Sequence, residues 1–304
     1  DVRESLDTVL LLVFLVSVFS ASQDIVIDAY RRELLPDDEL GAGNGFYAQA
    51  YRIASFVPGS LGLILAGFFP WSIAHLSIAM FMSVGIVTTL VMSETSRQGE
   101  EPQSIRSAVI DPFKEFFGRD GWQQAMWILL FIIFYKLGDS MATALETPFF
   151  LDMGFSTVEI GSIAKVSKTI GATAGTILGG ILMIKLGINR CLWIFGFFQL
   201  ISILGYVALS MVGYNYLMLA LASGFEYFGV GLGSVALIAF MAKSTNRHFT
   251  ATQFALLSSI AVIPRTFVSA ATGFIIEAVG YTQFFMICFL CAIPGMLMLF
   301  KIAP

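Results

Sequence analysis

The sequence has few charged residues and few side chains that bind metals. Charged residues make up 12% of the 304, about half the share of roughly 25% that soluble domains carry. The three cysteines and two histidines form no combined cluster with the spacing of a zinc site. We therefore expect no disulfide framework, no bound metal and no cofactor.

The sequence also lacks the short motifs of common enzymes. It contains no phosphate-binding Gly-x-x-x-x-Gly-Lys-Ser/Thr, no His-Glu-x-x-His and no Gly-x-Ser-x-Gly. The net charge is −4 and no basic patch stands out, so nucleic acid is not an expected partner. A membrane-embedded enzyme would need a nucleophile with a base or a metal cluster, and we expect no enzymatic activity.

Long apolar runs dominate what is present. Hydrophobic residues make up 57% of the chain, and the mean hydropathy is +0.82. A run of about 20 apolar residues is long enough to cross a bilayer as a helix. The sequence predicts an all-α, polytopic membrane protein with nine such helices, at 8–30, 45–68, 72–92, 124–150, 158–184, 190–212, 215–241, 251–278 and 282–302.

One long polar connection, 93–123, divides these helices into three and then six. We expect residues 1–92 to form part of an amino-terminal half and residues 124–304 to form a six-helix carboxyl-terminal half. Within the connection, 111–122 has aromatic residues on one side of a helix, which is typical of an amphipathic interfacial helix. We expect this helix to act as a latch between the halves.

The distribution of Lys and Arg predicts the orientation in the membrane. If 31–44 faces the cytoplasm, that side carries eleven of the seventeen basic residues, the other side carries only Arg3, and five lie inside helices. This bias predicts a periplasmic amino terminus and a cytoplasmic carboxyl terminus for the chain.

The segment from Gly180 to Arg190 reads Gly-Ile-Leu-Met-Ile-Lys-Leu-Gly-Ile-Asn-Arg. It resembles the cytoplasmic Gly-x-x-x-Asp-Arg-x-Gly-Arg-Arg loop of the major facilitator superfamily, with Ile184 at the acidic position. Further segments resemble the AmpG-type permeases of that superfamily: Ser22-Gln-Asp-Ile-Val-Ile-Asp-Ala-Tyr30, Gly41-Ala-Gly43, Phe117-Gly-Arg119, Tyr135-Lys-Leu-Gly-Asp139, Gly179-Gly-Ile-Leu-Met183 and Ala251-Thr-Gln-Phe-Ala-Leu-Leu-Ser258. The resemblance implies two six-helix halves that rock about a central site. The first three helices of that fold would then be missing from this sequence.

The resemblance also implies a function. AmpG-type permeases import anhydro-muropeptides (N-acetylglucosaminyl-anhydro-N-acetylmuramyl peptides) across the bacterial inner membrane for peptidoglycan recycling. We accordingly expect a proton-coupled, monomeric importer in the inner membrane, with the muropeptide, protons and lipid as partners. Eukaryotic acetyl-CoA transporters share the Ser-Gln-Asp-x-x-x-Asp pattern, so another anionic solute such as acetyl-CoA remains an alternative. A permease-like sensor that binds the solute without transporting it is a second one.

Charged residues within apolar runs are costly and usually face a protein interior or an aqueous path. Lys136 and Asp139, three residues apart near the middle of one run, are the main candidates. Lys136 is expected to hold an anionic group and Asp139 to exchange a proton or bind a sugar hydroxyl, unless the two form only a structural ion pair. Tyr135 beside them is a candidate for sugar contact.

A second basic pair, Lys165 and Lys168, lies in the outer half of the next helix. Counting depth at 1.5 Å per residue places Lys165 level with Glu146 on the neighbouring helix. This predicts a Glu146–Lys165 ion pair and leaves Lys168 as a ligand for a substrate carboxylate.

Glu226 and Arg265 lie near the centres of consecutive helices. Glu226 is a candidate for proton coupling or substrate binding, and a switchable Glu226–Arg265 pair would serve both a structural and a gating role. Pro264 is expected to kink its helix. Gln253 at the start of that helix is expected either to gate the cytoplasmic side or, with Thr250 and Thr252, to form a polar cap.

The first helix carries Asp24 and Asp28, four residues apart on one face. They are candidates for proton coupling or gating, although Asp28 with the following Arg31 and Arg32 also fits a charge cluster at a helix end. Arg52 reaches a similar depth in the second helix. We therefore predict an Asp24–Arg52 pair, because an unpaired charge at that depth is much costlier than a paired one.

Overall fold

The computed structural model describes residues 6–36, 39–54, 57, 65, 68–92 and 105–303, and these residues form helices joined by short turns. No strand occurs among them. The prediction of an all-α membrane protein is confirmed. Helices satisfy their backbone hydrogen bonds internally, which is the requirement that hydrocarbon imposes on a crossing segment.

The amino-terminal helices are α1 (Leu6–Leu34), α2 (Leu40–Ala54), α4 (Trp71–Met80) and α5 (Met82–Val91), followed by the connecting helix α6 (Ile105–Arg119). The bundle that follows contains α7 (Trp122–Ala144), α8 (Glu146–Asp152), α9 (Thr157–Glu159), the π-helix η2 (Ile160–Ala164), α10 (Lys165–Val212), α11 (Tyr216–Ser244), α12 (Thr250–Ile263), the π-helix η3 (Pro264–Val268) and α13 (Ser269–Ile302).

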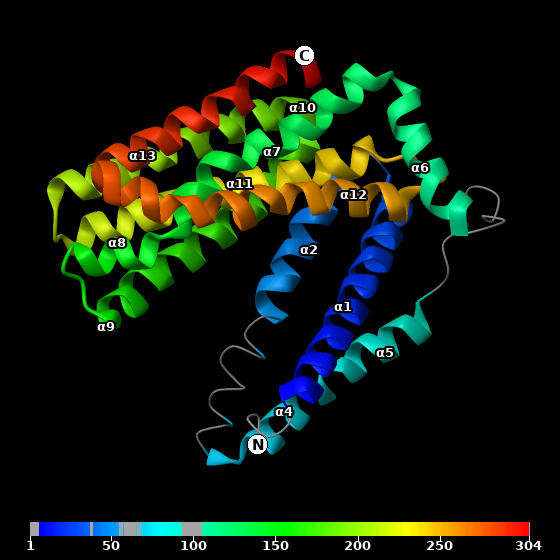
Figure 1. The fold of residues 1–304 in the computed structure, drawn as a ribbon, viewed down its shortest axis with the longest axis horizontal. Coiled ribbons are helices and arrows are strands. Elements are labelled where there is room, and N and C mark those ends of the chain that lie inside the picture. Colours follow the sequence, from blue (N-terminus) through cyan, green and yellow to red (C-terminus); the bar gives the residue numbers. More distant parts are fainter. Residues whose placement is uncertain are drawn as a thin grey trace.

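Two glycines turn long helices into hairpins. Gly187 has φ +75° within α10, and Gly280 has φ +78° within α13. Positive φ is a conformation that glycine adopts without steric cost, so each helix reverses there and contributes two antiparallel arms (Figure 1). These turns agree with the helix boundaries predicted at 184–190 and 278–282.

By length and hydropathy, seven helical segments of the described chain are able to cross a membrane. Two of them, Ile160–Val212 and Ala270–Ile302, contain the Gly187 and Gly280 turns. The predicted helix 45–68 falls partly outside the described residues. The count of nine crossing helices therefore stays a prediction, as does the division at 92 and 123.

The carboxyl-terminal bundle holds two clusters of buried apolar residues, one around Phe131, Phe195 and Phe240, the other around Phe149, Tyr206 and Phe285. Between α10 and α11 the backbones themselves touch. A Cβ on Gly171 would lie 2.1 Å from the carbonyl oxygen of Gly224, and one on Gly175 would lie 2.3 Å from that of Phe228. Small residues give transmembrane helices this close approach.

The thiols of the bundle are all free. Cys288 and Cys291 are three residues apart on α13, in the spacing Cys-x-x-Cys, but Cys288 is buried among apolar side chains. The described residues hold no group of three or more potential metal ligands, and Cys288 packs in the second of these apolar clusters.

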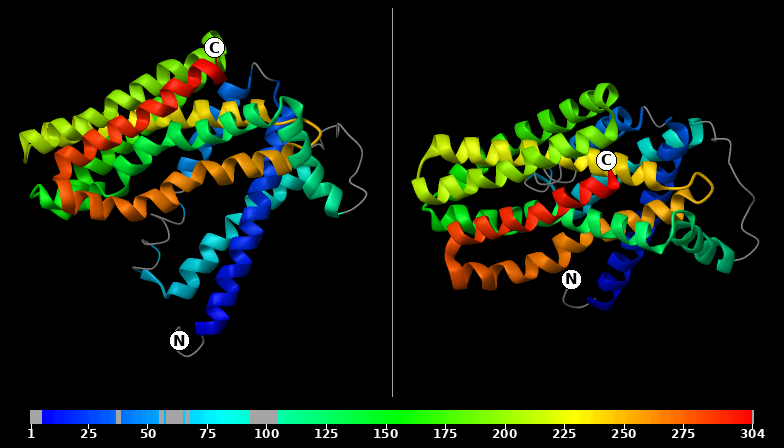
Figure 2. Two further views of the ribbon diagram at one scale, coloured as in Figure 1. Left: turned by 45° about the horizontal axis from the view of Figure 1, so that its top comes forward. Right: turned by 90° about the horizontal axis from the view of Figure 1, so that it is seen from above.

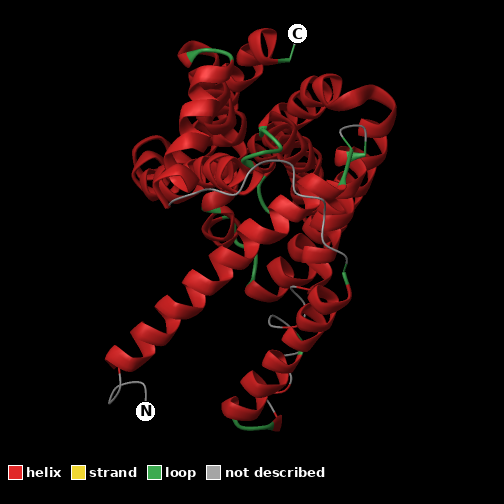
Figure 3. Cartoon of the chain, turned by 90° about the vertical axis from the view of Figure 1, so that its right-hand side faces the viewer, coloured by secondary structure: helices red, strands yellow, loops and turns green. Residues whose placement is uncertain are grey.

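One end of the bundle gathers α6 and the carboxyl terminus (Figure 1). The second arm of α10 begins there, where Trp193 Nε1 donates to the Ala303 carbonyl. We call this end of the bundle the basic end because Lys185, Arg190, Lys243 and Lys301 lie there. The amino-terminal helices meet the bundle at this end and diverge from it along their length (Figures 1, 2 and 3). Most of α1 is exposed, including Phe19 at 70% and Val26 at 66%, an apolar surface suited to hydrocarbon.

Candidate functional site

One face of the bundle is turned toward the amino-terminal helices. On α10, Thr176, Gly180 and Met183 follow each other at helical spacing and lie against α2: Cβ atoms added to Gly41 and Gly45 would lie 2.5 Å from Met183 Cβ and 3.3 Å from Gly180 Cα. Residues four apart share a helix face. Lys168, two turns before Thr176, therefore extends the same stripe beyond the part that α2 covers.

A first ion pair joins Lys136 and Asp139 of α7. Lys136 Nζ lies 2.5 Å from Asp139 Oδ2 and also donates to Ser234 Oγ of α11 at 3.2 Å. The Lys136 side chain is 15% exposed, whereas that of Asp139 is only 3% exposed. The other carboxylate oxygen, Asp139 Oδ1, has no hydrogen-bond partner. The pair is thus formed, but one of its acceptors is unused.

A second ion pair joins Lys168 of α10 and Glu146 of α8, and each side chain is 13% exposed. Two tyrosines also donate to the carboxylate, Tyr206 to Oε2 at 3.0 Å and Tyr227 to Oε1 at 2.9 Å. Lys168 Nζ lies 5.0 Å from the ring centre of Phe150 and 5.3 Å from that of Tyr227. The lysine is therefore held by one carboxylate and by the electron-rich faces of two rings.

The predicted Glu146–Lys165 pair is wrong, because Lys165 is exposed and Glu146 pairs with Lys168. Depth counting assumed two continuous α-helices. The first is interrupted at Leu145, with φ −120° and ψ 29°, and the second begins with the π-helix η2. A π turn inserts an extra residue into the helix, so the register after it differs from a count at 1.5 Å per residue.

Glu226 of α11 lies behind the two ion pairs and is fully buried. Its Oε2 accepts from Ser202 Oγ at 2.8 Å, and its Oε1 has no hydrogen-bond partner. Glu226 and Arg265 are therefore not hydrogen-bonded to each other, and a switchable Glu226–Arg265 pair stays a prediction. Arg265 lies in η3, where its side chain is exposed. The irregularity predicted at Pro264 is present, and it takes the form of this π turn.

The three carboxylates form one electrostatic cluster. Lys136, Asp139 and Glu146 all lie near enough to Glu226 to act on its charge. Three carboxylates against the two ammonium groups of Lys136 and Lys168 leave one negative charge in excess. Buried charge without compensation is costly. Binding of one proton to a carboxylate of this cluster would therefore remove the excess charge and stabilise the cluster.

Tyr135 does not join the two lysines. Its ring is 4% exposed, and its hydroxyl donates to the Leu192 carbonyl at 3.1 Å. Gln199 Nε2 donates to the Tyr135 carbonyl at 3.3 Å, and both residues border a small void next to Gly196. The structure thus turns Tyr135 toward the second arm of α10.

Three residues of this polar interior were not singled out from the sequence: Gln199, Ser202 and Tyr206. They follow each other at spacings of three and four in an otherwise apolar stretch of α10. Such a polar stripe on one face of a crossing helix was the available signal, since polar side chains inside a membrane protein need partners.

On α1, Asp24 is exposed, whereas Asp28 pairs with Arg31 at 2.8 Å. Arg31 also lies 3.9 Å from the ring centre of Tyr47, and Arg32 Nε donates to the Ala242 carbonyl at 2.6 Å. The structure therefore supports a charge cluster at the end of this helix. The Arg52 side chain lies outside what the structure describes, so the Asp24–Arg52 pair stays a prediction.

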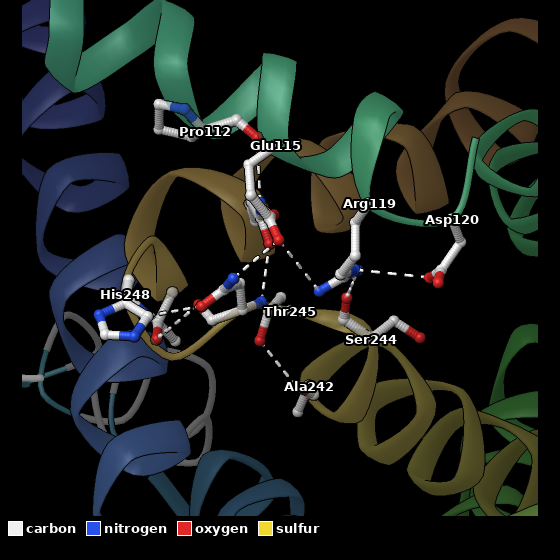
Figure 4. Close-up of polar contacts among 11 residues, drawn as sticks. Pro112, Glu115, Arg119, Asp120, Ala242, Ser244, Thr245 and His248 are labelled. Atoms are coloured by element: carbon white, nitrogen blue, oxygen red, sulfur yellow. Dashed lines mark hydrogen bonds and ion pairs between the residues drawn. The ribbon is translucent and has the colours of Figure 1, made fainter. Parts of the chain in front are cut away.

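Gln253 of α12 is hydrogen-bonded to α6. Figure 4 shows Glu115 and Arg119 of α6 turned toward the segment that carries Ser244 and Thr245. Gln253 Nε2 donates to Glu115 Oε2 at 2.5 Å and to the Pro112 carbonyl at 3.0 Å, and its Oε1 accepts from the Asn246 backbone at 2.7 Å. Asn246 Nδ2 donates to Glu115 Oε1 at 2.7 Å, and Arg119 donates to the Ser244 carbonyl at 2.8 Å. We call these five residues (Glu115, Arg119, Ser244, Asn246 and Gln253) the α6 latch.

Comparison with known proteins identifies the family. The sequence pattern of the Major Facilitator Superfamily matches residues 4–260. An uncharacterized protein of Haemophilus influenzae is 42% identical over 313 residues, which cover 100% of this chain and 74% of that protein. A Rickettsia conorii protein named "Putative transporter AmpG 4" is 30% identical over 302 residues, covering 97% and 72%.

The Escherichia coli K12 "Anhydromuropeptide permease" is 36% identical over 290 residues, covering 95% of this chain and 58% of the permease. The chain thus spans less than two thirds of that permease. These matches confirm a multi-pass transport protein, as opposed to an enzyme. The chain belongs to the major facilitator superfamily and, within it, to the AmpG-type permeases.

Proposed function

We propose that this protein imports anhydro-muropeptides across the inner membrane in symport with protons. The observation that carries the proposal is the pair of largely buried lysine–carboxylate contacts, Lys136–Asp139 and Lys168–Glu146. We assign both to the bundle face turned toward the amino-terminal helices. Charged groups at this depth mark substrate paths in transporters. The substrate class is taken from the name of the E. coli relative.

The two lysines supply the binding chemistry for an anionic ligand. Each already neutralises a carboxylate of the protein, and each retains some exposure, 15% for Lys136 and 13% for Lys168. A ligand carboxylate can therefore replace Asp139 or Glu146 without requiring the lysine to be desolvated anew. Exchange of this kind keeps the lysine compensated in both the empty and the loaded state.

The proton is assigned to Glu226. Its carboxylate is fully buried, has one oxygen without a partner and belongs to the cluster with one negative charge in excess. The groups that act on it are Lys136, Asp139 and Glu146, with Ser202 as hydrogen-bond donor; Tyr206, Tyr227 and Cys288 also lie within electrostatic range. Protonation of Glu226 balances the cluster while both ion pairs are intact.

The orientation follows from the ends of the bundle. Basic residues lie at the α6 end, whereas the opposite end carries Asp152 and Glu159, so we assign the basic end to the cytoplasm. The carboxyl terminus is then cytoplasmic and the amino terminus of the chain periplasmic. The halves meet at the basic end, where Asp28 and the α6 latch would form the cytoplasmic gate. The face with the ion pairs would then open toward the periplasm.

The test is uptake of radiolabelled anhydro-muropeptide by right-side-out vesicles that carry this protein. An acidic exterior should drive accumulation, an uncoupler should abolish it, and the solute should be recovered unmodified. Binding without accumulation would indicate a sensor, and accumulation of acetyl-CoA instead would indicate another solute. A chemically altered product would indicate an enzyme.

Glu226→Gln should uncouple substrate transport from proton transport. We expect gradient-driven accumulation to fall at least tenfold while exchange of external for internal substrate continues, because exchange needs no net proton movement. Glu277→Gln, on an exposed glutamate of α13, is the matched control. Unchanged accumulation in Glu226→Gln would remove this residue from proton coupling.

A further inference from the structure

The Glu146–Lys168 pair differs from an ordinary structural ion pair in its surroundings. Three helices are irregular around it: α7 ends at Ala144 before the break at Leu145, η2 precedes Lys165, and η3 holds Arg265. Gly273, which follows η3, is close to Leu145, since a Cβ added to the glycine would lie 3.9 Å from Leu145 Cδ1. Arg265 acts electrostatically on Tyr227, which donates to Glu146.

Irregular turns of this kind cluster at functional sites of membrane transporters, where they allow side chains to change partners. Glu146 stands at the first position of α8, directly after the break. The carboxylate is held by donors from two other helices, Tyr206 and Tyr227, which remain in place if the lysine moves. Lys168 in turn is held by the rings of Phe150 and Tyr227. Each partner therefore has contacts that do not depend on the ion pair, and Tyr227 contributes to both.

We propose that Glu146 and Lys168 form an exchange site for a zwitterionic end group of the ligand, an ammonium and a carboxylate on the same amino-acid unit. The ligand carboxylate replaces Glu146 at Lys168, and the ligand ammonium replaces Lys168 at Glu146. The ion pair between Glu146 and Lys168 is thus replaced by two ion pairs between the protein and the ligand, so neither protein charge is left without a partner. The inference rests on the proposed import of a peptide-bearing sugar and names the part of the peptide that is read.

The Lys136–Asp139 pair is less suited to this role. Its two members are three residues apart on one helix, and the Asp139 side chain is 3% exposed. A ligand ammonium cannot reach that carboxylate without entering the packed interior. The site that accepts both charges of a zwitterion is therefore the one built from two helices, in which both side chains are 13% exposed.

Equilibrium binding in detergent tests the inference with three ligands. The first is an anhydro-muropeptide in which one peptide residue carries both a free side-chain amine and a free carboxylate. The second is the same compound with that amine acetylated, and the third is the anhydro-disaccharide without peptide. We expect the protein to bind the first at least about tenfold more tightly than the second, the size of effect that a lost charge-assisted hydrogen bond produces.

Glu146→Gln should reduce this preference to less than about threefold, and a size-exclusion profile that matches that of the unaltered protein shows that the variant is folded. Lys168→Met should weaken binding of both peptide ligands. Lys165→Met, which removes an exposed lysine three residues away on the same helix, should leave all three affinities as they are.

Equal affinity of the unaltered protein for the free and acetylated ligands would overturn the inference, and so would a preference that persists in Glu146→Gln. Neither result bears on uptake, which is measured separately in vesicles. Failure of the proposed import would instead appear as absence of accumulation for every muropeptide, whether or not the amine preference is present in binding.

Discussion

At the scale of single residues, burial sets the cost of each charge in the site. Asp139 is 3% exposed and depends on Lys136 for its only ion pair in the described structure. Breaking a buried pair by removing one partner typically costs about 3–5 kcal/mol, because the remaining charge stays buried. The stability of α7 within the bundle is thus tied to a contact that also belongs to the candidate substrate path.

Lys136→Met should therefore lower the thermal unfolding temperature of the purified protein by ~6 °C or more, given a shift of about 2–4 °C per kcal/mol in proteins of this size. The double variant Lys136→Met/Asp139→Asn should recover most of the loss, because the buried charge is then absent. Lys165→Met is the control. A melting temperature that is unchanged by Lys136→Met would show that Asp139 does not need its partner.

Glu159, outside the crossing segments, provides a pH dependence. Hydrogen bonds from Tyr216, the Ser156 backbone and Tyr214 lower the pKa of this carboxyl from 4.5 to about 2. A carboxyl whose pKa is lower in the folded state stabilises the fold above its unfolded pKa, and this contribution is lost as the pH falls toward 2. The α9 turn should therefore loosen in acid.

The measurement is the unfolding temperature between pH 5 and pH 3 for the unaltered protein and for Glu159→Gln. The unaltered protein should lose more stability over this interval, since the variant has no carboxyl to titrate there. Asp152→Asn removes a nearby acid for which Tyr281 is the hydrogen-bond donor, and it serves as a comparison. Equal acid sensitivity of the unaltered protein and Glu159→Gln would contradict the assignment.

At the scale of helices, backbone contact between α10 and α11 fixes the positions of Lys168 and Glu226. A Cβ at Gly171 would come within 2.1 Å of the Gly224 carbonyl oxygen, a backbone atom that cannot rotate away. Gly171→Ala should therefore separate the two helices, lower the yield of folded protein and weaken substrate binding by at least about tenfold.

Gly161→Ala is the matched control, since a Cβ there would meet nothing within 4 Å. Size-exclusion profiles and ligand binding of the two variants give the comparison. If Gly171→Ala behaves like Gly161→Ala, the close contact between α10 and α11 does not occur in the protein.

The helices themselves could be predicted from the sequence because each needs only a local apolar run. The reversals near 187 and 280 were also visible, through Gly187 with its flanking charges and through the gap between two runs. The partner of Glu146 could not be predicted, since it depends on the break at Leu145 and on η2, which have no counterpart in hydropathy. The contact of Gln253 with Glu115 spans 138 residues and depends on where α6 lies.

At the scale of the whole molecule, the amino-terminal helices and the bundle meet at the basic end and diverge from it (Figures 1 and 2). The α6 latch lies at this meeting point, where Glu115 joins α6 to Gln253 and Asn246. The face with the two ion pairs lies along the diverging part. The central claim is that this face is reached by water and substrate from the side opposite the basic end.

Cysteine accessibility tests this claim most directly. Ser234, which accepts from Lys136, is replaced by Cys in a background in which Cys191, Cys288 and Cys291 are serine. Ser223→Cys, on a fully buried serine of the same helix, is the control. Both variants are exposed to a membrane-impermeant thiol reagent from the periplasmic side, with and without anhydro-muropeptide.

The account predicts that the Ser234→Cys variant is labelled within minutes, that the muropeptide protects it, and that the Ser223→Cys variant stays unlabelled. Absence of labelling at position 234 from either side of the membrane, or labelling that the muropeptide does not affect, would contradict a substrate path along this face.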